Sequence, residues 1–176
     1  MNQQGLITKI KQGKIFIYPT DTVYGIGCNA EDKKAVDKIK EIKLRDKDKP
    51  LSIIAPSIDW IKENCITNNI EFSKYFPGPY TIILEKKNPN FLQHISNTNT
   101  LGIRIPKSDF CFKIQKSNLP FITTSVNKSG EKPATRISDI NKEIINKVDE
   151  VIEIEDESKL SGKPSTLIIN NKEIKR

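Results

Sequence analysis

Seven short apolar runs, rich in β-branched residues, recur along the chain, and helical patterns lie between several of them. A run of four or five such residues is typical of a buried strand, whereas apolar residues three or four positions apart mark one face of a helix. Both patterns in one chain predict an α/β or α+β domain in which helices flank a mixed sheet of about seven strands. The predicted strands are residues 15–18, 51–55, 81–84, 101–105, 121–124, 151–154 and 166–169.

The clearest helical pattern has Ala35, Val36, Ile39 and Ile42 on one face and Lys and Asp on the other. Weaker patterns predict helices at 6–10, 58–61, 72–76, 110–114 and 137–148. No repeat, low-complexity tract or linker rich in Pro, Gly or Ser divides the sequence, so we expect residues 1–176 to form a single domain. We expect the tail, residues 170–176, to be partly loose.

The composition excludes several classes of protein. With 176 residues and 36% hydrophobic side chains, the chain can bury a sizeable core, which excludes full disorder. No apolar run reaches the roughly 18 residues of a membrane span and no signal peptide opens the sequence, so we expect a soluble cytoplasmic protein without a membrane partner. Cys28, Cys65 and Cys111 are far apart and form no CxxC pair, so we expect reduced thiols and no protein-bound metal.

Arginine is scarce among the basic residues. Of the 29 Lys and Arg residues, only Arg45, Arg104, Arg136 and Arg176 are arginine. A guanidinium grips a carboxylate or phosphate with a planar fork that an ammonium cannot copy, so each arginine in this lysine-rich chain is a candidate anion-binding residue. The formal net charge of +7 likewise favours an anionic partner such as a nucleotide or RNA.

Four segments place small polar or charged residues at the ends of predicted elements, as binding loops do. They are residues 18–27, 43–51, 101–106 and 123–135. Arg104 interrupts an apolar strand, so it must either pair with a structural carboxylate or point into a ligand site. Gly25 and Gly27 lack the spacing of a dinucleotide fingerprint, and residues 157–165 do not form a phosphate loop. From the residues alone, we infer a cleft that binds a nucleotide or another polyanion.

The order of short motifs along the chain resembles that of the YrdC-like family. Pro-Thr-Asp-Thr-Val-Tyr-Gly stands at 19–25, Lys-Leu-Arg at 43–45, Lys-Pro-Leu at 49–51, Phe-Pro-Gly-Pro-Tyr-Thr at 76–81, Gly-Ile-Arg-Ile-Pro at 102–106, Ser-Val-Asn-Lys-Ser-Gly at 125–130 and Ser-Thr at 165–166. The chain is most similar to the single-domain threonylcarbamoyl-AMP synthases, without the extra C-terminal domain of the longer form. The resemblance covers about residues 13–176 and implies a twisted mixed sheet with a central, positively charged cleft.

The resemblance implies an enzyme, a nucleotidyltransferase that condenses L-threonine, bicarbonate and ATP into threonylcarbamoyl-AMP and pyrophosphate. Other proteins, the threonylcarbamoyl transferases, then pass the threonylcarbamoyl group to tRNA next to the anticodon, and tRNA itself is a candidate contact. ATP is a substrate that carries Mg²⁺ on its phosphates, and no protein-bound metal is implied.

The family's motifs assign roles to single residues of this sequence. By resemblance, the residues that act on the triphosphate and the reacting carbamate are Lys43, Arg45, Ser125 and Asn127. Those that hold threonine are Thr22, Arg104, Thr123 and Ser165. Those that hold ATP are Arg45, Lys49, Thr100, Ser125 and Arg176.

Two alternatives belong to other classes. A non-catalytic YrdC-like protein would bind structured RNA through a basic concavity and would tolerate the loss of Arg104, one cation among many. Aromatic residues are only 7% of the chain and none lies within the cation-rich segment 43–49, which disfavours stacking on single strands. A carbamoyl-transfer enzyme of hydrogenase maturation is disfavoured because the zinc-type cysteine motifs and further domains of those proteins are missing here.

The sequence departs from the family at two positions, Asp46, where a proline is frequent, and Pro133, where a serine that faces ATP is frequent. Pro133 lacks both a hydroxyl and a backbone N–H. Because Pro133 removes both donors, we expect a slightly altered phosphate grip without loss of function, so P133S, which restores them, should change the KM for ATP. Initial rates of pyrophosphate release at varied ATP measure this, and an unchanged KM would show that position 133 does not contribute to phosphate binding.

Overall fold

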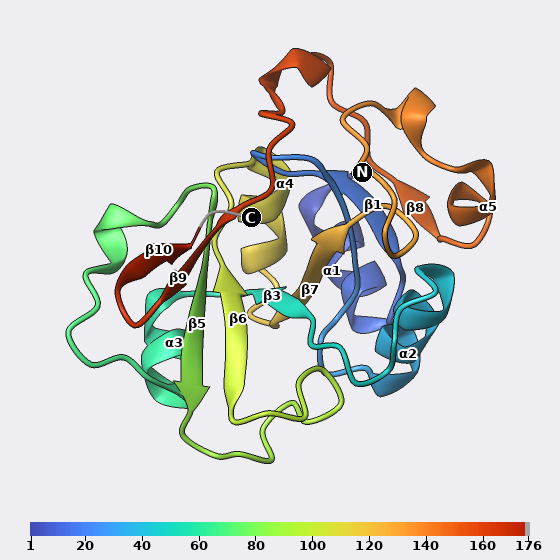
Figure 1. The fold of residues 1–176 in the computed structure, drawn as a ribbon. Helices are drawn as coiled ribbons and strands as arrows, with labels where there is room; N and C mark the ends of the chain where they lie inside the picture. The colour runs from blue at the N-terminus through green and yellow to red at the C-terminus, as the bar shows by residue number, and fades with distance from the viewer. Residues whose placement is uncertain (175–176) are drawn as a thin grey trace.

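The computed structural model describes residues 1–174, in which ten strands form one sheet (Figure 1). In chain order the strands are β1 (Phe16–Pro19), β2 (Tyr24–Gly27), β3 (Ser52–Ile54), β4 (Cys65–Ile66), β5 (Tyr80–Lys86), β6 (Thr100–Arg104), β7 (Phe121–Ser125), β8 (Glu150–Val151), β9 (Thr166–Ile169) and β10 (Lys172–Ile174). Their order in the sheet is β10-β9-β5-β6-β3-β7-β2-β1-β8, with β4 paired to β5. The pairs β1–β8, β3–β6 and β5–β9 are parallel and the others antiparallel, which confirms the predicted mixed sheet.

Five α-helices accompany the sheet in the described chain: α1 (Gln3–Lys11), α2 (Lys33–Ile42), α3 (Ile58–Asn64), α4 (Asp109–Gln115) and α5 (Lys142–Ile145). Short 3₁₀ turns lie at Phe72–Lys74, Ile137–Asp139 and Glu157–Lys159. The N-cap residues of the first three α-helices are Asn2, Asp32 and Ser57. The side chain of each accepts a hydrogen bond from the backbone N–H of the residue three positions later. Such caps satisfy one of the free N–H groups at a helix start. None of the helices in residues 1–174 is long and apolar enough to cross a membrane.

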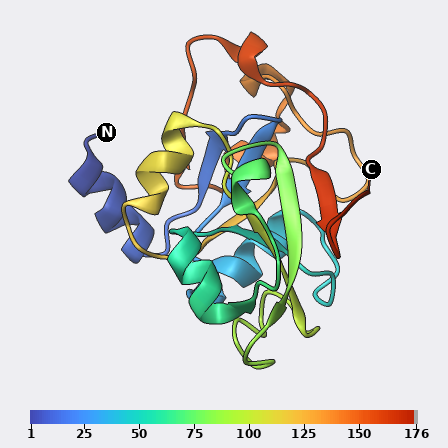
Figure 2. The same ribbon diagram turned by 90° about the vertical axis from the view of Figure 1, so that its left-hand side faces the viewer.

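Two apolar clusters lie on opposite faces of the sheet. On one face, Ile53 and Ile122 belong to a cluster with apolar residues of α2 and α3. On the other, Ile54 and Phe121 pack with residues of α1 and α4, two helices that lie side by side (Figure 2). Because successive side chains of a strand point to opposite faces, each central strand contributes to both clusters. The domain therefore has three layers, with the sheet in the middle.

Polar side chains follow the apolar ones on the face that α1 and α4 cover. Ser52 lies two residues before Ile54, and Thr123 lies two residues after Phe121, so both share that face. The register pairs Ser52 with Gly102 on one side and with Thr123 on the other. Three neighbouring strands thus present small or polar residues at one level, where an open binding floor can form.

The segment Tyr24–Gly27 is a strand, and its interpretation as a loop with Gly25 and Gly27 was wrong. Glycine is a poor strand former, but here close approach of the neighbouring strand requires it. A Cβ atom at Gly27 would lie 1.9 Å from the backbone oxygen of Ile122 on β7. The glycines that weakened the strand signal are therefore the residues that allow β2 to pack between its neighbours.

Two further expectations were wrong. The single helix predicted at 137–148 is a 3₁₀ turn followed by the short α5, because Ile140 has an extended backbone (ψ 130°) and the Asn141 side chain starts a new helix by accepting from Glu143 N. The tail is not loose up to residue 174, since β9 and β10 form a hairpin. Asn170 and Asn171 make its two-residue turn, both with positive φ, a conformation that asparagine tolerates well.

The packing of β7 against α4 predicts how much a single aromatic residue contributes to stability. Phe121 is fully buried beside Phe16 and Tyr18. We expect F121A to lower the free energy of unfolding by about 3–5 kcal/mol, because it leaves a cavity in the cluster. Urea denaturation measures the loss.

The matched control is F112A on α4, whose side chain is 38% exposed. It should cost less than about 1 kcal/mol. Equal losses for the two variants would contradict the assignment of Phe121 to the core.

Candidate functional site

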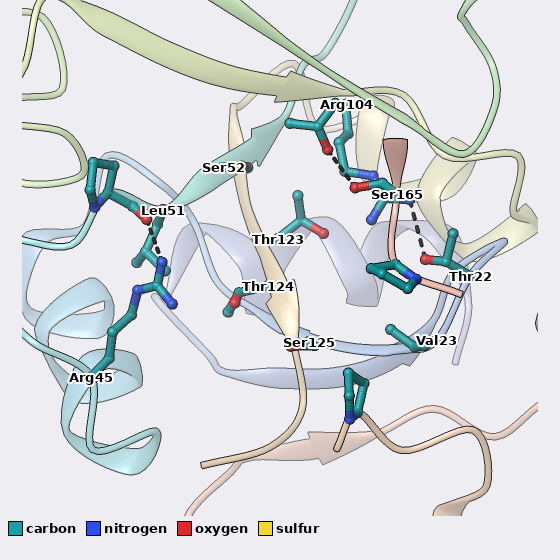
Figure 3. A pocket seen from close by; sticks show the side chains of 14 residues that line it. Thr22, Val23, Arg45, Leu51, Ser52, Arg104, Thr123, Thr124, Ser125 and Ser165 are labelled. Atoms are coloured by element: carbon teal, nitrogen blue, oxygen red, sulfur yellow. Dashed lines mark hydrogen bonds between the residues drawn. The ribbon is translucent and has the colours of Figure 1, made fainter. Parts of the chain in front are cut away.

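A cavity of about 200 Å³ opens on the polar part of the sheet (Figure 3). Strands β3, β5, β6 and β7 form its floor, and the loops around residues 22, 50, 133 and 164 form its rim. Its lining residues are Thr22, Val23, Arg45, Pro50, Leu51, Ser52, Thr81, Arg104, Thr123, Thr124, Ser125, Pro133, Pro164 and Ser165. Six of these were predicted as site residues, and they come from five separate segments of the chain.

Arg104 is the buried cation of this cavity. Its side chain has an ion pair with Asp21, with 2.9 Å between Nη2 and Oδ1, and Nη2 also lies 3.4 Å from Thr22 Oγ1. The other Asp21 oxygen accepts a hydrogen bond from the backbone of Lys107 at 3.0 Å, which fixes the carboxylate. The Arg104 Nε is buried and has no partner among the described residues. The sequence left two roles open for Arg104, and the structure combines them: a structural carboxylate holds one edge of the guanidinium while the residue lines a cavity.

Hydroxyl groups surround the rest of the deep end. Thr81 Oγ1 and Ser165 Oγ are 2.8 Å apart and both buried, although 84 residues separate them in the chain. Antiparallel pairing of Ile82 with Ile103 places Thr81 directly across from Arg104. A hydroxyl both donates and accepts, so this end suits a small ligand that carries a carboxylate together with other polar groups.

Arg45, two residues beyond the C-cap of α2, lines the opposite end of the cavity (Figure 3). The helix ends in a Schellman motif: Arg45 N bonds to Lys40 O at 2.9 Å and Leu44 N to Glu41 O at 3.0 Å. Leu44 takes the left-handed conformation (φ 49°) that glycine usually supplies, and its side chain is 69% exposed. The reversal points Arg45 towards the cavity, where its Nη2 donates to Pro50 O at 2.6 Å.

Lys43 is buried at the C-cap of α2. It is only 2% exposed, and its Nζ donates to the backbone oxygens of Ser125 and Asn127. Burial, together with the nearby cations of Arg45 and Lys49, lowers the pKa of Lys43 to about 7. Among the described residues that line the cavity, Lys43 is absent. Its ammonium therefore contacts the wall of the site on the side that faces away from the cavity.

The remaining predicted residues lie near the cavity or outside the described chain. The Asn127 amide nitrogen donates to the Lys128 and Glu131 carbonyls, both at 2.8 Å, and so shapes its own loop. Lys49 is exposed beside Arg45, whose Nε lies 3.3 Å from its carbonyl. Thr100 is exposed at the far end of β6 from Arg104. Arg176 lies outside the described residues.

Sequence reasoning missed three residues of this site: Asp21, Ser52 and Thr81. Ser52 and Thr81 are single hydroxyl residues in predicted strands that are otherwise apolar. The same signal, a polar residue inside an apolar strand, singled out Arg104 and could have found them. Asp21 lies in a segment that the sequence analysis marked, but its pairing across 83 residues with Arg104 depends on the fold.

The site offers cations and hydroxyls rather than metal ligands. Within residues 1–174, no three His, Cys, Asp or Glu side chains gather closely enough to hold a metal ion. Cys28, Cys65 and Cys111 are buried free thiols, and burial raises the pKa of Cys65 to about 11, so that thiol is inert near neutral pH.

The sequence matches the model of a known protein family. The Sua5/YciO/YrdC family, described as telomere recombination, matches residues 8–175 of the sequence. The chain therefore belongs to the Sua5/YciO/YrdC family.

Several known proteins are similar in sequence or structure to most of this chain. A Methanocaldococcus jannaschii protein, provisionally named threonylcarbamoyl-AMP synthase, is 42% identical over 163 residues, which cover 91% of this chain and 76% of that protein. The threonylcarbamoyl-AMP synthase of Pyrococcus abyssi is 31% identical over 149 residues, or 82% of this chain and 44% of that protein. The crystal structure of P. abyssi Sua5 complexed with L-threonine superposes with a TM-score of 0.81 at 28% identity, covering 97% of this chain and 51% of that one. The chain thus spans about half the length of the P. abyssi protein.

The environment of Lys43 predicts a pH dependence of stability. Its pKa in the folded protein, about 7, is lower than the ordinary 10.5, so between these values the unfolded chain binds more protons than the folded one. The free energy of unfolding therefore rises with pH across this window through Lys43. We expect urea denaturation between about pH 7 and pH 10 to show a steeper rise for the wild type than for K43M. Parallel curves would contradict the burial of this ammonium.

Proposed function

We propose that this chain is an L-threonylcarbamoyladenylate synthase, which joins L-threonine, bicarbonate and ATP and releases pyrophosphate. The observation that carries the proposal is one cavity with a buried guanidinium, Arg104, at its deep end and a second guanidinium, Arg45, at the other. Such a cavity can hold two separate anions in fixed relative positions. The names of the relatives, and the L-threonine bound to P. abyssi Sua5, support the same substrates here.

Threonine is proposed to bind at the deep end. Its carboxylate would meet the free edge of Arg104, because the bidentate geometry of a guanidinium suits a carboxylate and Asp21 already fixes the other edge. Thr22 and Thr123 lie beside it on the cavity wall, and Ser165 closes the far side. The amine of threonine would then face the centre of the cavity, where it reacts with bicarbonate to give a carbamate and water.

ATP is proposed to bind at the Arg45 end. Arg45 and the exposed Lys49 supply positive charge for the phosphates, and Ser125 lies on the wall between the two ends. Gly102 pairs with Ser52, and Thr100 lies two residues before Gly102 on β6. Thr100 is therefore at the end of β6 that lies nearer to Arg45. Mg²⁺ would be carried by the ATP phosphates. No function is proposed for Arg176 from the structure.

The proposed reaction places modest demands on the protein. A carbamate oxygen attacks the α-phosphorus of ATP, and the bond to the bridging oxygen breaks as pyrophosphate leaves. The protein has to bring together two anions that repel one another and stabilise the charge that develops on the phosphates. Fixed cations and hydroxyls on a rigid sheet supply both effects.

The product would pass to threonylcarbamoyl transferases that modify tRNA next to the anticodon, in the cytoplasm. The net charge of +7 is compatible with a tRNA contact, although a polar cavity with a guanidinium at each end favours the synthase over a protein that only binds RNA. Residues 1–176 are proposed to act as one domain.

Pyrophosphate release by the purified chain tests the proposal. ATP, Mg²⁺, threonine and bicarbonate are supplied together, each is then omitted in turn, and serine is added as a competitor. Release that requires both threonine and bicarbonate supports the synthase. Absence of release under all conditions argues against it, and binding of tRNA that weakens steeply with salt would then favour the RNA-binding alternative.

Replacing Arg104 with lysine tests the carboxylate site. The ammonium of R104K keeps the charge beside Asp21 but loses the planar fork. We expect the KM for threonine to rise by about 10- to 100-fold while the KM for ATP stays within about twofold. Steady-state kinetics with each substrate varied measures both constants.

R136A is the matched control, because Arg136 is exposed and does not line the cavity. It should leave both constants unchanged. A similar small effect of R104K and R136A would contradict the assignment of Arg104 to threonine.

A further inference from the structure

Within residues 1–174, three lysines are almost fully buried, and each uses its ammonium in the same way. Lys40, Lys43 and Lys86 are 7%, 2% and 2% exposed, and the Nζ of each donates to two backbone carbonyls. A buried ammonium needs such partners, because a charge without hydrogen bonds is costly in the interior. Among the three, only Lys43 contacts a strand and loop that form the wall of the cavity.

Lys43 joins the end of α2 to the loop after β7 through three hydrogen bonds. Its Nζ donates to Ser125 O and Asn127 O, and its own carbonyl accepts from Ser129 N at 2.8 Å. Both side chain and backbone of one residue thus hold the segment 125–129 against the helix. Ser125, the first residue of that segment, has its side chain on the cavity wall.

A direct contact between Lys43 and a phosphate would require a rearrangement. Lys43 is 2% exposed, is absent from the cavity lining among the described residues and already donates through its ammonium to two carbonyls, so a phosphate could reach its third N–H only if the wall of the cavity moved. Arg45, by contrast, lines the cavity itself, and Lys49 is exposed next to Pro50, which also lines it. The arrangement therefore separates the roles of the two basic residues in the Lys-Leu-Arg motif.

We infer that Lys43 is a positioning residue, which fastens the loop carrying Ser125 and Asn127 to α2 and does not bind the triphosphate. The catalytic consequence rests on the proposed synthase function, whereas the fastening itself is a property of the ligand-free fold. The fastening survives a change of charge, because a neutral amine keeps two N–H donors for the two carbonyls.

The variant K43M tests the fastening. Methionine fills a similar volume but cannot donate, so the amides of residues 126–131 should exchange with solvent about tenfold faster in ligand-free K43M than in the wild type. If the enzyme is the proposed synthase, displacement of Ser125 should lower kcat by about 100-fold. Hydrogen exchange and pyrophosphate release measure the two effects.

K86M is the matched control, because Lys86 is as buried as Lys43 and donates to the carbonyls of Phe91 and Ser96, which do not line the cavity. K86M should speed amide exchange in the loop that contains Phe91 and Ser96. The exchange rates of residues 126–131 and the kcat should both stay within about twofold of the wild-type values. A merely structural role of Lys43 predicts instead that K43M and K86M have the same effect on kcat.

A measurement on the wild type keeps the inference testable if K43M does not fold. In the ligand-free protein, an amine-acetylating reagent should leave Lys43 unmodified, with or without ATP, while the exposed Lys49 is modified. Mass spectrometry of peptides reads out each site.

The inference is overturned if Lys43 is acetylated in the absence of ATP and protected in its presence, or if residues 126–131 of K43M exchange as slowly as in the wild type. Failure of the proposed function is a different result, since a wild type without pyrophosphate release leaves the exchange and acetylation data intact.

Discussion

The alternation of side chains along the central strands is the constraint on which the rest of the structure depends. One strand face must serve both the apolar contact with α1 and α4 and the open binding floor, so each of β3 and β7 changes from apolar to polar residues within two positions. Ile54 and Phe121 lie under the helices, and Ser52 and Thr123 lie beyond them. A slip of one residue in register would bury the hydroxyls and expose the core, so the stability of the sheet and the geometry of the site are specified by the same pairing.

The cations of the site differ in their surroundings, and those surroundings separate their roles. Arg104 is buried and neutralised by Asp21, which keeps it in place before any ligand arrives. Arg45 lines the cavity and donates to the carbonyls of Lys49 and Pro50. Lys43 is buried against carbonyls without a carboxylate partner, and the pKa of its ammonium falls accordingly. Electrostatic preorganisation of this kind lets a protein stabilise developing charge without rearranging during the reaction.

The sequence predicted the elements whose signals are local and missed those that depend on distant partners. Six of the seven predicted strands exist over most of their length, because runs such as 101–105 are apolar enough to mark a buried strand alone, whereas 151–154 is a strand only at Val151, in the two-residue β8. Strand β2 was not predicted because its two glycines are explained only by neighbours in the fold: Gly25 by the ring of Tyr18, and Gly27 by the backbone of Ile122, nearly one hundred residues away. The regular spacing of Ile140 and Ile144 correctly indicated burial but not a continuous helix, since the cap at Asn141 interrupts it. For the site, the motifs located six lining residues, whereas Ser52 and Thr81 were missed although they interrupt apolar strands, and the partner of Arg104 depended on the fold.

The parallel pairing of β5 with β9 has a consequence for the order of events during synthesis on the ribosome. Thr22, Arg104 and Thr123 emerge from the ribosome well before Ser165, which closes the same cavity next to β9. A nascent chain that has not yet added β9 beside β5 lacks the Thr81–Ser165 hydroxyl pair and one wall of its binding site. Substrate binding and completion of the sheet are therefore coupled, so a ligand that fills the cavity favours chains whose last strands have already docked.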